Sequence, residues 1–320
     1  MISRLWKFTG VFGLGLSAVV LATPALAGDP ESCKAVRLSD VGWTDITATT
    51  AMTAAILETM GYALQIQQLA VPVTFASMKN KDIDVFLGNW MPSMENDIKA
   101  YREDGTVETI GANLEGAKYT LAVPDYTYEA GLKDFKDVAK FKDQLGGKIY
   151  GIEPGNDGNR LVLNMIKDDA KWGLSGFELV ESSEAGMLSQ VAKAVAANQP
   201  VVFLGWAPHP MNTKFKMKYL TGGDDVFGPN FGGATVYTTV RKGYVQECPN
   251  AGKFVSNLKF TLDMENEIMG EILDKGADAK TAAVAWLKAH PDAVNPWLDG
   301  VTTFDGSGDA LTAVKTGLGS

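Results

Sequence analysis

The sequence of 320 residues predicts an α/β protein built from two similar lobes. The first observation is a repeat: VFLGNWMPSM at residues 85–94 returns as VFLGWAPHPM at residues 202–211, in each case an apolar run followed by Trp and Pro. The second is that strand-like apolar runs alternate with helical segments, as in mostly parallel sheets covered by helices. The third is that the two repeats close units of similar length, one opening near Trp43 and the other near Asn156.

The first unit is expected to open with a strand at residues 35–41 and a Thr- and Ala-rich helix that ends near Met60. Gly61 follows as the stop signal of that helix. The rest of the unit is a strand at 64–70, a short helix near 74–80 and a strand at 84–90.

The second unit repeats this order. Its expected elements are a strand at 147–153, a loop at 154–158, a helix at 160–172, a strand at 177–182, a helix at 184–197 and a strand at 201–206. No linker rich in Ser, Gly or Pro separates the units, so the chain is expected to cross between them in ordered segments near residues 118–124 and 231–240.

The remaining segments are expected to return to the first lobe. An apolar stripe predicts one helix over residues 254–273, with Leu258, Leu262, Met269 and Ile272 on its buried face. Helices are expected around 281–290 and 291–298, and a less ordered tail after about residue 300. This gives a first lobe of residues 28–115 and 213–320 and a second lobe of residues 116–212.

The first 27 residues have the features of a secretory signal peptide. Arg4 and Lys7 precede an apolar stretch that ends in Ala25-Leu26-Ala27, so cleavage is expected after Ala27. No later stretch reaches the roughly 18 apolar residues of a membrane span. We therefore expect a protein exported to the periplasm.

The sequence contains two cysteines, Cys33 and Cys248. In an oxidising compartment such a pair is most simply interpreted as one disulfide, and two unpaired buried thiols are the alternative. A disulfide here would bring the chain back to the lobe in which it started.

Composition and motifs argue against several classes of function. The formal net charge of −9 disfavours nucleic-acid binding and mildly favours a small cationic ligand. The sequence lacks the Gly-x-Ser-x-Gly, His-Glu-x-x-His and paired Cys-x-x-Cys motifs. Of its two histidines, His209 between prolines is expected to be structural or at a rim, and His290 to end a helix. We expect no enzyme, no metal site and no cofactor, with a hydrolase acting through carboxylates as the alternative.

Aromatic residues stand where the predicted strands end. Ligands of open parallel sheets bind beyond the carboxyl ends of the strands, and Trp43, Trp90 and Trp206 all fall there. Each could be an ordinary packing residue, but three at matching places favour a binding site. Tyr119, on the first crossing, is a further candidate. Rings around one point bind a cation that cannot donate hydrogen bonds, above all a quaternary ammonium group.

Two polar residues open the helices beside these rings. Asp45 could cap its helix, or its carboxylate could attract the cation and accept a hydrogen bond from a ligand hydroxyl. Asn156 holds the corresponding place in the second unit, where it could cap a helix or bind an alcohol. An ionised Asp45 would repel the carboxylate of glycine betaine and favour choline.

Together the segments VRLSDVGWTD, DVFLGNWMP, GIEPGNDGN and VVFLGWAPHPM make the sequence similar to a known family, the periplasmic substrate-binding proteins of ABC importers for quaternary ammonium compounds. The similarity is strongest to the choline-binding branch and covers nearly the whole mature chain. It implies a two-lobed type II periplasmic substrate-binding fold with a hinge between the lobes. It also implies an aromatic box and a hydroxyl-binding pair, formed by Trp43, Trp90, Tyr119 and Trp206 and by Asp45 and Asn156 respectively.

The resemblance implies a monomeric protein that captures choline, closes its lobes over it and delivers it to an ABC permease in the inner membrane. Within the same family, a protein that binds glycine betaine, proline betaine or acetylcholine is the alternative. A choline-sensing receptor component is a second alternative, and an exported choline esterase is the enzymatic one.

Overall fold

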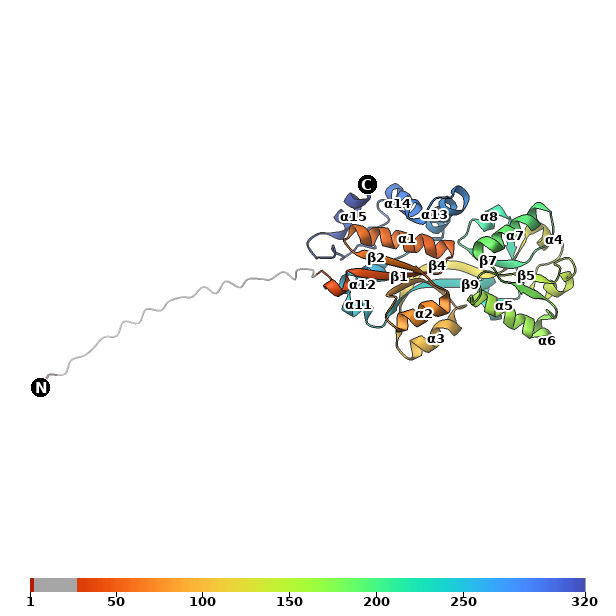
Figure 1. Ribbon diagram of the computed structural model, residues 1–320, viewed down its shortest axis with the longest axis horizontal. Coiled ribbons are helices and arrows are strands. Elements are labelled where there is room, and N and C mark those ends of the chain that lie inside the picture. Colours follow the sequence, from red (N-terminus) through yellow and green to blue (C-terminus); the bar gives the residue numbers. More distant parts are fainter. Residues whose placement is uncertain (3–27, 320) are drawn as a thin grey trace.

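The computed structural model describes residues 1–2 and 28–319 (Figure 1). The expected signal peptide, residues 1–27, therefore lies almost entirely outside the described residues. Within the described part of the chain, no helix is long and apolar enough to cross a membrane.

The described strands form one mixed sheet in the order β2-β1-β3-β9-β4-β7-β5-β6, and β8 pairs with β4. The strands are β1 Ala35–Asp40, β2 Ala63–Gln68, β3 Val85–Met91, β4 Val107–Pro124, β5 Lys148–Tyr150, β6 Glu178–Val180, β7 Phe203–Ala207, β8 Met217–Tyr219 and β9 Gly233–Arg241. We call β2, β1 and β3 the first half of the sheet and β7, β5 and β6 the second half. The strands within each half are parallel, as the sequence predicts.

The helices cover both faces of each half (Figure 1). The α-helices are α1 Thr44–Thr59, α2 Val71–Lys79, α3 Glu95–Glu103, α4 Asp125–Glu129, α5 Asp157–Lys167, α6 Asp169–Trp172, α7 Glu184–Ala196, α8 Met211–Lys214, α9 Asp224–Phe227, α10 Pro229–Gly232, α11 Tyr244–Glu247, α12 Pro249–Asn257, α13 Leu262–Lys275, α14 Ala279–Ala289 and α15 Ala310–Leu318; the 3-10 helices are η1 Glu31–Cys33 and η2 Phe135–Phe141. Helix α1 is buried on nearly every side between the sheet and α13, α14 and α15. Its small Ala and Thr side chains allow this close packing.

Two long strands connect the halves. β4 pairs with β9 along residues Val107–Lys118 and with β7 along Lys118–Ala122, while β9 also pairs with β3. Figure 1 shows both strands running through the middle of the molecule. The crossings expected near 118–124 and 231–240 are therefore strands of the sheet, and the first is much longer than expected. The β4–β9 ladder contains register shifts at three places.

Three sequence expectations about helices are wrong. The segment expected as one helix over 254–273 is two helices, because Thr261 caps a new helix by accepting a hydrogen bond from the Met264 N–H. The helix expected over 160–172 breaks at Asp168, whose backbone is not helical. Residues 291–298, expected as a helix, form successive turns.

The tail after residue 300 is also more ordered than expected. Helix α15 packs on α1 and α14. The backbone N–H and hydroxyl of Thr302 both donate to the side-chain oxygen of Asn250. Short apolar stretches such as ALTAVKTGL carry little local signal, and their order here comes from packing on the first lobe.

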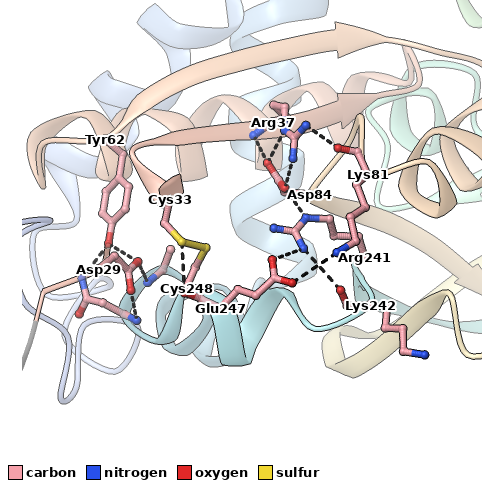
Figure 2. The surroundings of a disulfide bond; sticks show 12 residues. Asp29, Cys33, Arg37, Tyr62, Lys81, Asp84, Arg241, Lys242, Glu247 and Cys248 are labelled. Atoms are coloured by element: carbon pink, nitrogen blue, oxygen red, sulfur yellow. Dashed lines mark hydrogen bonds and ion pairs between the residues drawn. A yellow bond between two sulfur atoms is a disulfide. The ribbon is translucent and has the colours of Figure 1, made fainter. Parts of the chain in front are cut away.

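The disulfide between Cys33 and Cys248 is present, with Cα atoms 5.6 Å apart (Figure 2). Beside it the buried carboxylate of Asp84 accepts hydrogen bonds from Arg37 and Arg241, at 2.6–2.9 Å. Arg241 also donates to Glu247 at 2.6 Å. These bonds and the disulfide fasten η1, the loop before β3 and the returning chain together, as the cysteine pair predicts.

Candidate functional site

A closed cavity lies between the two halves of the sheet. Its lining is Trp43, Asp45, Trp90, Tyr119, Ile152, Asp157 and Trp206, and the space between these side chains is about 260 Å³. Each of these residues is at most 6% exposed, so the cavity is shut off from solvent. A buried space lined mostly by aromatic side chains suits a small molecule.

The repeated sequence phrases supply two walls of this cavity. Trp90 lies near the end of β3 and Trp206 near the end of β7, one in each half of the sheet. Each strand is followed by a cis peptide bond to proline, Met91–Pro92 and Ala207–Pro208. Trp43 comes from the loop after β1, where it is the N-cap residue of α1. The carboxyl ends of strands from both halves thus meet at one cavity, as expected for α/β sheets.

Tyr119, on the crossing strand β4, lies between two of the tryptophans. Its ring centre is 6.2 Å from that of Trp90 and 6.3 Å from that of Trp206, with interplanar angles of 66° and 83°. Rings at such angles form separate walls rather than a stack. Together with Trp43 they give the cavity electron-rich faces from several directions, an arrangement that binds cations.

Hydrogen bonds fix the orientation of two rings. The Trp43 indole N–H donates to the Oε1 of Glu153 at 2.9 Å. The Tyr119 hydroxyl donates to the Oδ1 of Asn156 at 2.8 Å. Because both acceptors belong to the loop before α5, this one loop holds rings that come from two other elements.

Asp45, in the first turn of α1, faces the cavity and is 1% exposed. Neither of its carboxylate oxygens has a hydrogen-bond partner among the described residues. Burial and then the charge of Glu184 raise the pKa of Asp45 to about 8, against a smaller opposite effect of backbone N–H groups in the first turn. The side chain does not cap its helix, so it is available to a ligand.

Asn156 does not line the cavity. It is the N-cap residue of α5, where its Oδ1 accepts from the Asn159 N–H at 3.2 Å and from the Tyr119 hydroxyl. Its Nδ2 donates to Glu153. The side chain therefore caps α5 and holds the Tyr119 ring at the cavity, and its binding to a ligand hydroxyl stays a prediction.

Asp157, the next residue, lines the cavity instead and was missed by the sequence analysis. It is 0% exposed, and its carboxylate oxygens make no hydrogen bond to the described residues. Burial raises the pKa of Asp157 to about 7, an effect that the nearby Ser93 hydroxyl, bonded to the Trp90 carbonyl, only partly offsets. Its position in the first turn of α5, like that of Asp45 in α1, makes it a candidate beside Asn156 but does not tell which of these two neighbours faces the cavity.

A buried carboxylate at the start of α7 joins the two halves beside the cavity. Glu184 accepts hydrogen bonds from the Thr44 N–H at 2.8 Å and from the Thr44 hydroxyl at 2.5 Å. His209 lies 3.1 Å from the same carboxylate. Since the His209 Nδ1 accepts from the Met211 N–H, its Nε2 carries the proton and donates to Glu184. His209 is thus structural, as expected.

A second connection lies farther from the cavity. Arg160 of α5 donates two hydrogen bonds to Asp97 of α3, at 2.8 and 2.6 Å. Asp97 is mostly buried and Arg160 half-buried. Bidentate pairs of this kind are among the stronger ion pairs. The cavity is thus enclosed by direct bonds between elements that pack on different halves of the sheet.

Comparison with known proteins gives consistent matches. Residues 34–289 match a family model described as the substrate-binding domain of ABC-type glycine betaine transport systems. The chain is similar to an ABC-transporter choline-binding protein solved in complex with choline, at 63% identity, with 91% of this chain and 100% of that chain covered and a TM-score of 0.89. The same identity and coverage relate it to a choline-binding protein in an unliganded semi-closed conformation, with a TM-score of 0.83.

A curated relative extends these matches. The glycine betaine/carnitine transport binding protein GbuC of Listeria monocytogenes serotype 1/2a (strain 10403S) is 36% identical over 176 residues, which cover 54% of this chain and 56% of that protein. The family model spans most of the chain, and its match includes both halves of the sheet and the cavity between them. The chain therefore belongs to the family of substrate-binding domains of ABC-type glycine betaine transport systems.

Proposed function

We propose that this protein captures choline in the closed cavity and delivers it to the permease of an ABC importer. The observation that carries the proposal is a buried cavity with four aromatic walls, two carboxylates and, among the described residues, no basic side chain in its lining. Aromatic faces bind a quaternary ammonium group through cation–π attraction of about 0.5 to 2 kcal/mol per ring. The similarity to a protein solved with choline supports the same ligand.

The polar groups favour choline over the betaines. Glycine betaine carries a carboxylate, which needs hydrogen-bond donors or a cation to replace the water it loses. The lining offers the acceptors Asp45 and Asp157 instead. Choline suits such a cavity, because its ammonium group can lie against the rings and its hydroxyl can donate a hydrogen bond to a carboxylate. Acetylcholine has the cation but no hydroxyl donor and is expected to bind more weakly.

Ligand capture is proposed to proceed by closure of the lobes. The rings come from both halves of the sheet, so they can surround the cation only when the halves approach each other. We propose that the lobes separate near residue 115 and that the chain returns between β8 and β9. The pairing of β8 with the far end of β4 supports a return later than the boundary at 212 that the sequence suggests.

Location and partners follow from the same proposal. A cleaved signal peptide ending at Ala27 would place the protein in the periplasm, where it would meet the permease as a monomer. We propose that it performs no covalent chemistry and binds no nucleic acid. Choline sensing for a separate receptor would use the same cavity and remains the second candidate.

Isothermal titration of the ligand-stripped mature protein with choline, glycine betaine and acetylcholine tests the proposal. Choline should bind most tightly. Tighter binding of glycine betaine would make the protein a betaine carrier. No binding of any of the three ligands would contradict the proposed aromatic box, which we also call the cage. Assaying the same protein for release of choline from its esters tests the enzymatic alternative.

Substitution of the cage tryptophans tests the role of the rings. Trp90→Ala and Trp206→Ala should each weaken choline binding by about thirtyfold or more, because each removes up to about 2 kcal/mol of cation–π attraction and also opens the cavity to water. The far-UV circular dichroism should stay unchanged. Trp286→Ala, which removes an indole bonded to Glu267 outside the cavity, serves as the matched control. Full affinity in both cage variants would refute the aromatic box.

A further inference from the structure

Two carboxylates occupy matching places at the cavity. Asp45 lies in the first turn of α1, the helix that follows β1, and Asp157 lies in the first turn of α5, the helix that follows β5. β1 belongs to the first half of the sheet and β5 to the second. Both side chains line the cavity and are at most 1% exposed, and neither makes a hydrogen bond within the described residues. A buried carboxylate without partners is costly, which points to a ligand that supplies the missing interaction.

The surroundings of Asp157 do not neutralise it. Arg160 lies one turn along the same helix, but both of its terminal nitrogens donate to Asp97. The negative charge of Asp97 on α3 opposes the positive charge of Arg160, and the Ser93 hydroxyl and the first-turn backbone N–H of α5 offset the effect of burial on the pKa of Asp157 only in part. The net field at Asp157 from these groups is weak, so a positive charge inside the cavity would be its strongest partner.

The surroundings of Asp45 are more negative still. The charges of Glu184 from α7 and of Asp40 at the end of β1 act on it, whereas Glu265 from α13 keeps its proton because burial raises its pKa well above the usual value. Thr44 and His209 donate hydrogen bonds to Glu184. Among the described residues, no basic side chain lines the cavity to offset the negative charge. The whole region therefore favours positive charge.

We infer that Asp157 is a second specificity-determining residue of the cage, acting with Asp45 so that one carboxylate from each side selects a ligand with a net positive charge over a zwitterion. This inference rests on the proposed function, because it concerns how the same cavity distinguishes choline from betaines. A betaine would place its own carboxylate in a small buried space with two others. Like charges at such distances and low dielectric repel strongly, whereas the choline hydroxyl is neutral.

The protonation of the two groups agrees with this role. Burial raises the pKa of Asp157 to about 7, and burial together with Glu184 raises that of Asp45 to about 8. Without ligand, each therefore holds a proton for much of the time near neutral pH. A bound cation favours the charged forms, so choline binding should release protons and should strengthen as the pH rises.

The first experiment is titration of Asp157→Asn with choline and with glycine betaine at pH 8. Asparagine keeps the size of the side chain and removes its charge. Choline should bind about tenfold more weakly and the preference for choline over glycine betaine should fall at least about tenfold, because one close opposite charge is lost from a poorly screened site. Asp168→Asn, at the exposed end of α5, removes the same charge outside the cavity and should change neither value. An unchanged preference in Asp157→Asn would overturn the inference.

A second measurement is the number of protons released on choline binding at pH 7, obtained by calorimetry in buffers of different ionisation enthalpy. The wild type should release protons, and Asp157→Asn should release fewer even if its affinity changes little. Equal release in both proteins would also overturn the inference. These failures differ from a failure of the proposed function, in which the wild type itself would not bind choline.

Discussion

At the scale of single residues, Gly158 sets how closely Tyr119 approaches the start of α5. A Cβ at this position would overlap the Tyr119 hydroxyl. Gly158→Ala should therefore push the ring out of place, break its bond to Asn156 and weaken choline binding about tenfold, measured by titration. The control is Gly270→Ala in α13, where an added Cβ meets nothing within 4 Å. That change should leave binding unaltered and stabilise the helix by about 1 kcal/mol. Unaltered affinity in Gly158→Ala would contradict this role.

The aromatic residues of the cavity could be predicted residue by residue, whereas one of its carboxylates could not. Trp43, Trp90 and Trp206 follow apolar strands, and the ends of parallel strands meet at one edge. Asn156 and Asp157 are adjacent polar residues in one loop, and successive side chains at a helix start point about 100° apart. Which of the two faces the cavity depends on how α5 sits on the sheet, and this orientation comes from packing with residues far away in the chain.

At the scale of secondary-structure elements, the Arg160–Asp97 pair connects α5 to α3 without lining the cavity. Arg160→Gln should favour the open form and speed up release of every ligand, with affinities for choline and acetylcholine reduced by a similar factor of about three to ten. Stopped-flow displacement measures the release rate. The exposed pair Lys140–Asp137 stays within η2, so Lys140→Gln should change nothing. An altered ratio between the two ligands would show that Arg160 acts on the cavity itself.

Helices and strands could be predicted where the apolar periodicity is strong. The predictions were wrong where a helix cap interrupts that periodicity. The strands around VRLSD and VFLG stand out because they are apolar and short. The apolar stripe from Leu258 to Ile272 continues across the break between α12 and α13. Leu258 is buried like a residue inside a helix, although it is the residue at which α12 ends. Thr261 marks that break, but Thr is common inside helices too, so the cap becomes evident only from its bond to the Met264 N–H.

At the scale of the whole molecule, the raised carboxyl pKa values predict how stability depends on pH. The pKa values of Asp45 and Asp157 rise from 3.8 to about 8 and about 7, so between pH 4 and pH 8 the folded protein binds protons that the unfolded chain has lost. The free energy of unfolding without ligand should therefore fall as the pH rises through this window. Thermal unfolding of ligand-stripped protein between pH 5 and pH 9 measures it.

A matched variant separates this effect from other titrations. Asp45→Asn combined with Asp157→Asn should give a flatter profile over the same pH range, because neither residue then titrates. The lowered pKa values of exposed groups such as Asp104 and Asp305 act below about pH 4 and do not interfere. A wild-type stability that increases from pH 5 to pH 8 would contradict the assigned protonation.

Two-lobed organisation was predictable from the repeat, but a single continuous sheet was not. The repeat identifies β3 and β7 as equivalent strands, and the cysteine pair indicates that the chain returns. Neither the repeat nor the cysteine pair indicates that β4 extends over 18 residues and pairs with both β9 and β7. Pairing between strands so distant in sequence is fixed by register and hydrogen bonds that leave no local pattern.

The pair of crossing strands has a mechanical consequence. Two covalent connections that are also hydrogen-bonded to each other cannot stretch, and they prevent either lobe from turning freely about the other. They can bend or twist together, most easily where the β4–β9 ladder is already irregular, between Leu114 and Ala117. In the proposed closure, the relative motion of the lobes is thereby confined to nearly one coordinate, so each closure would bring Trp90 and Trp206 back to the same separation.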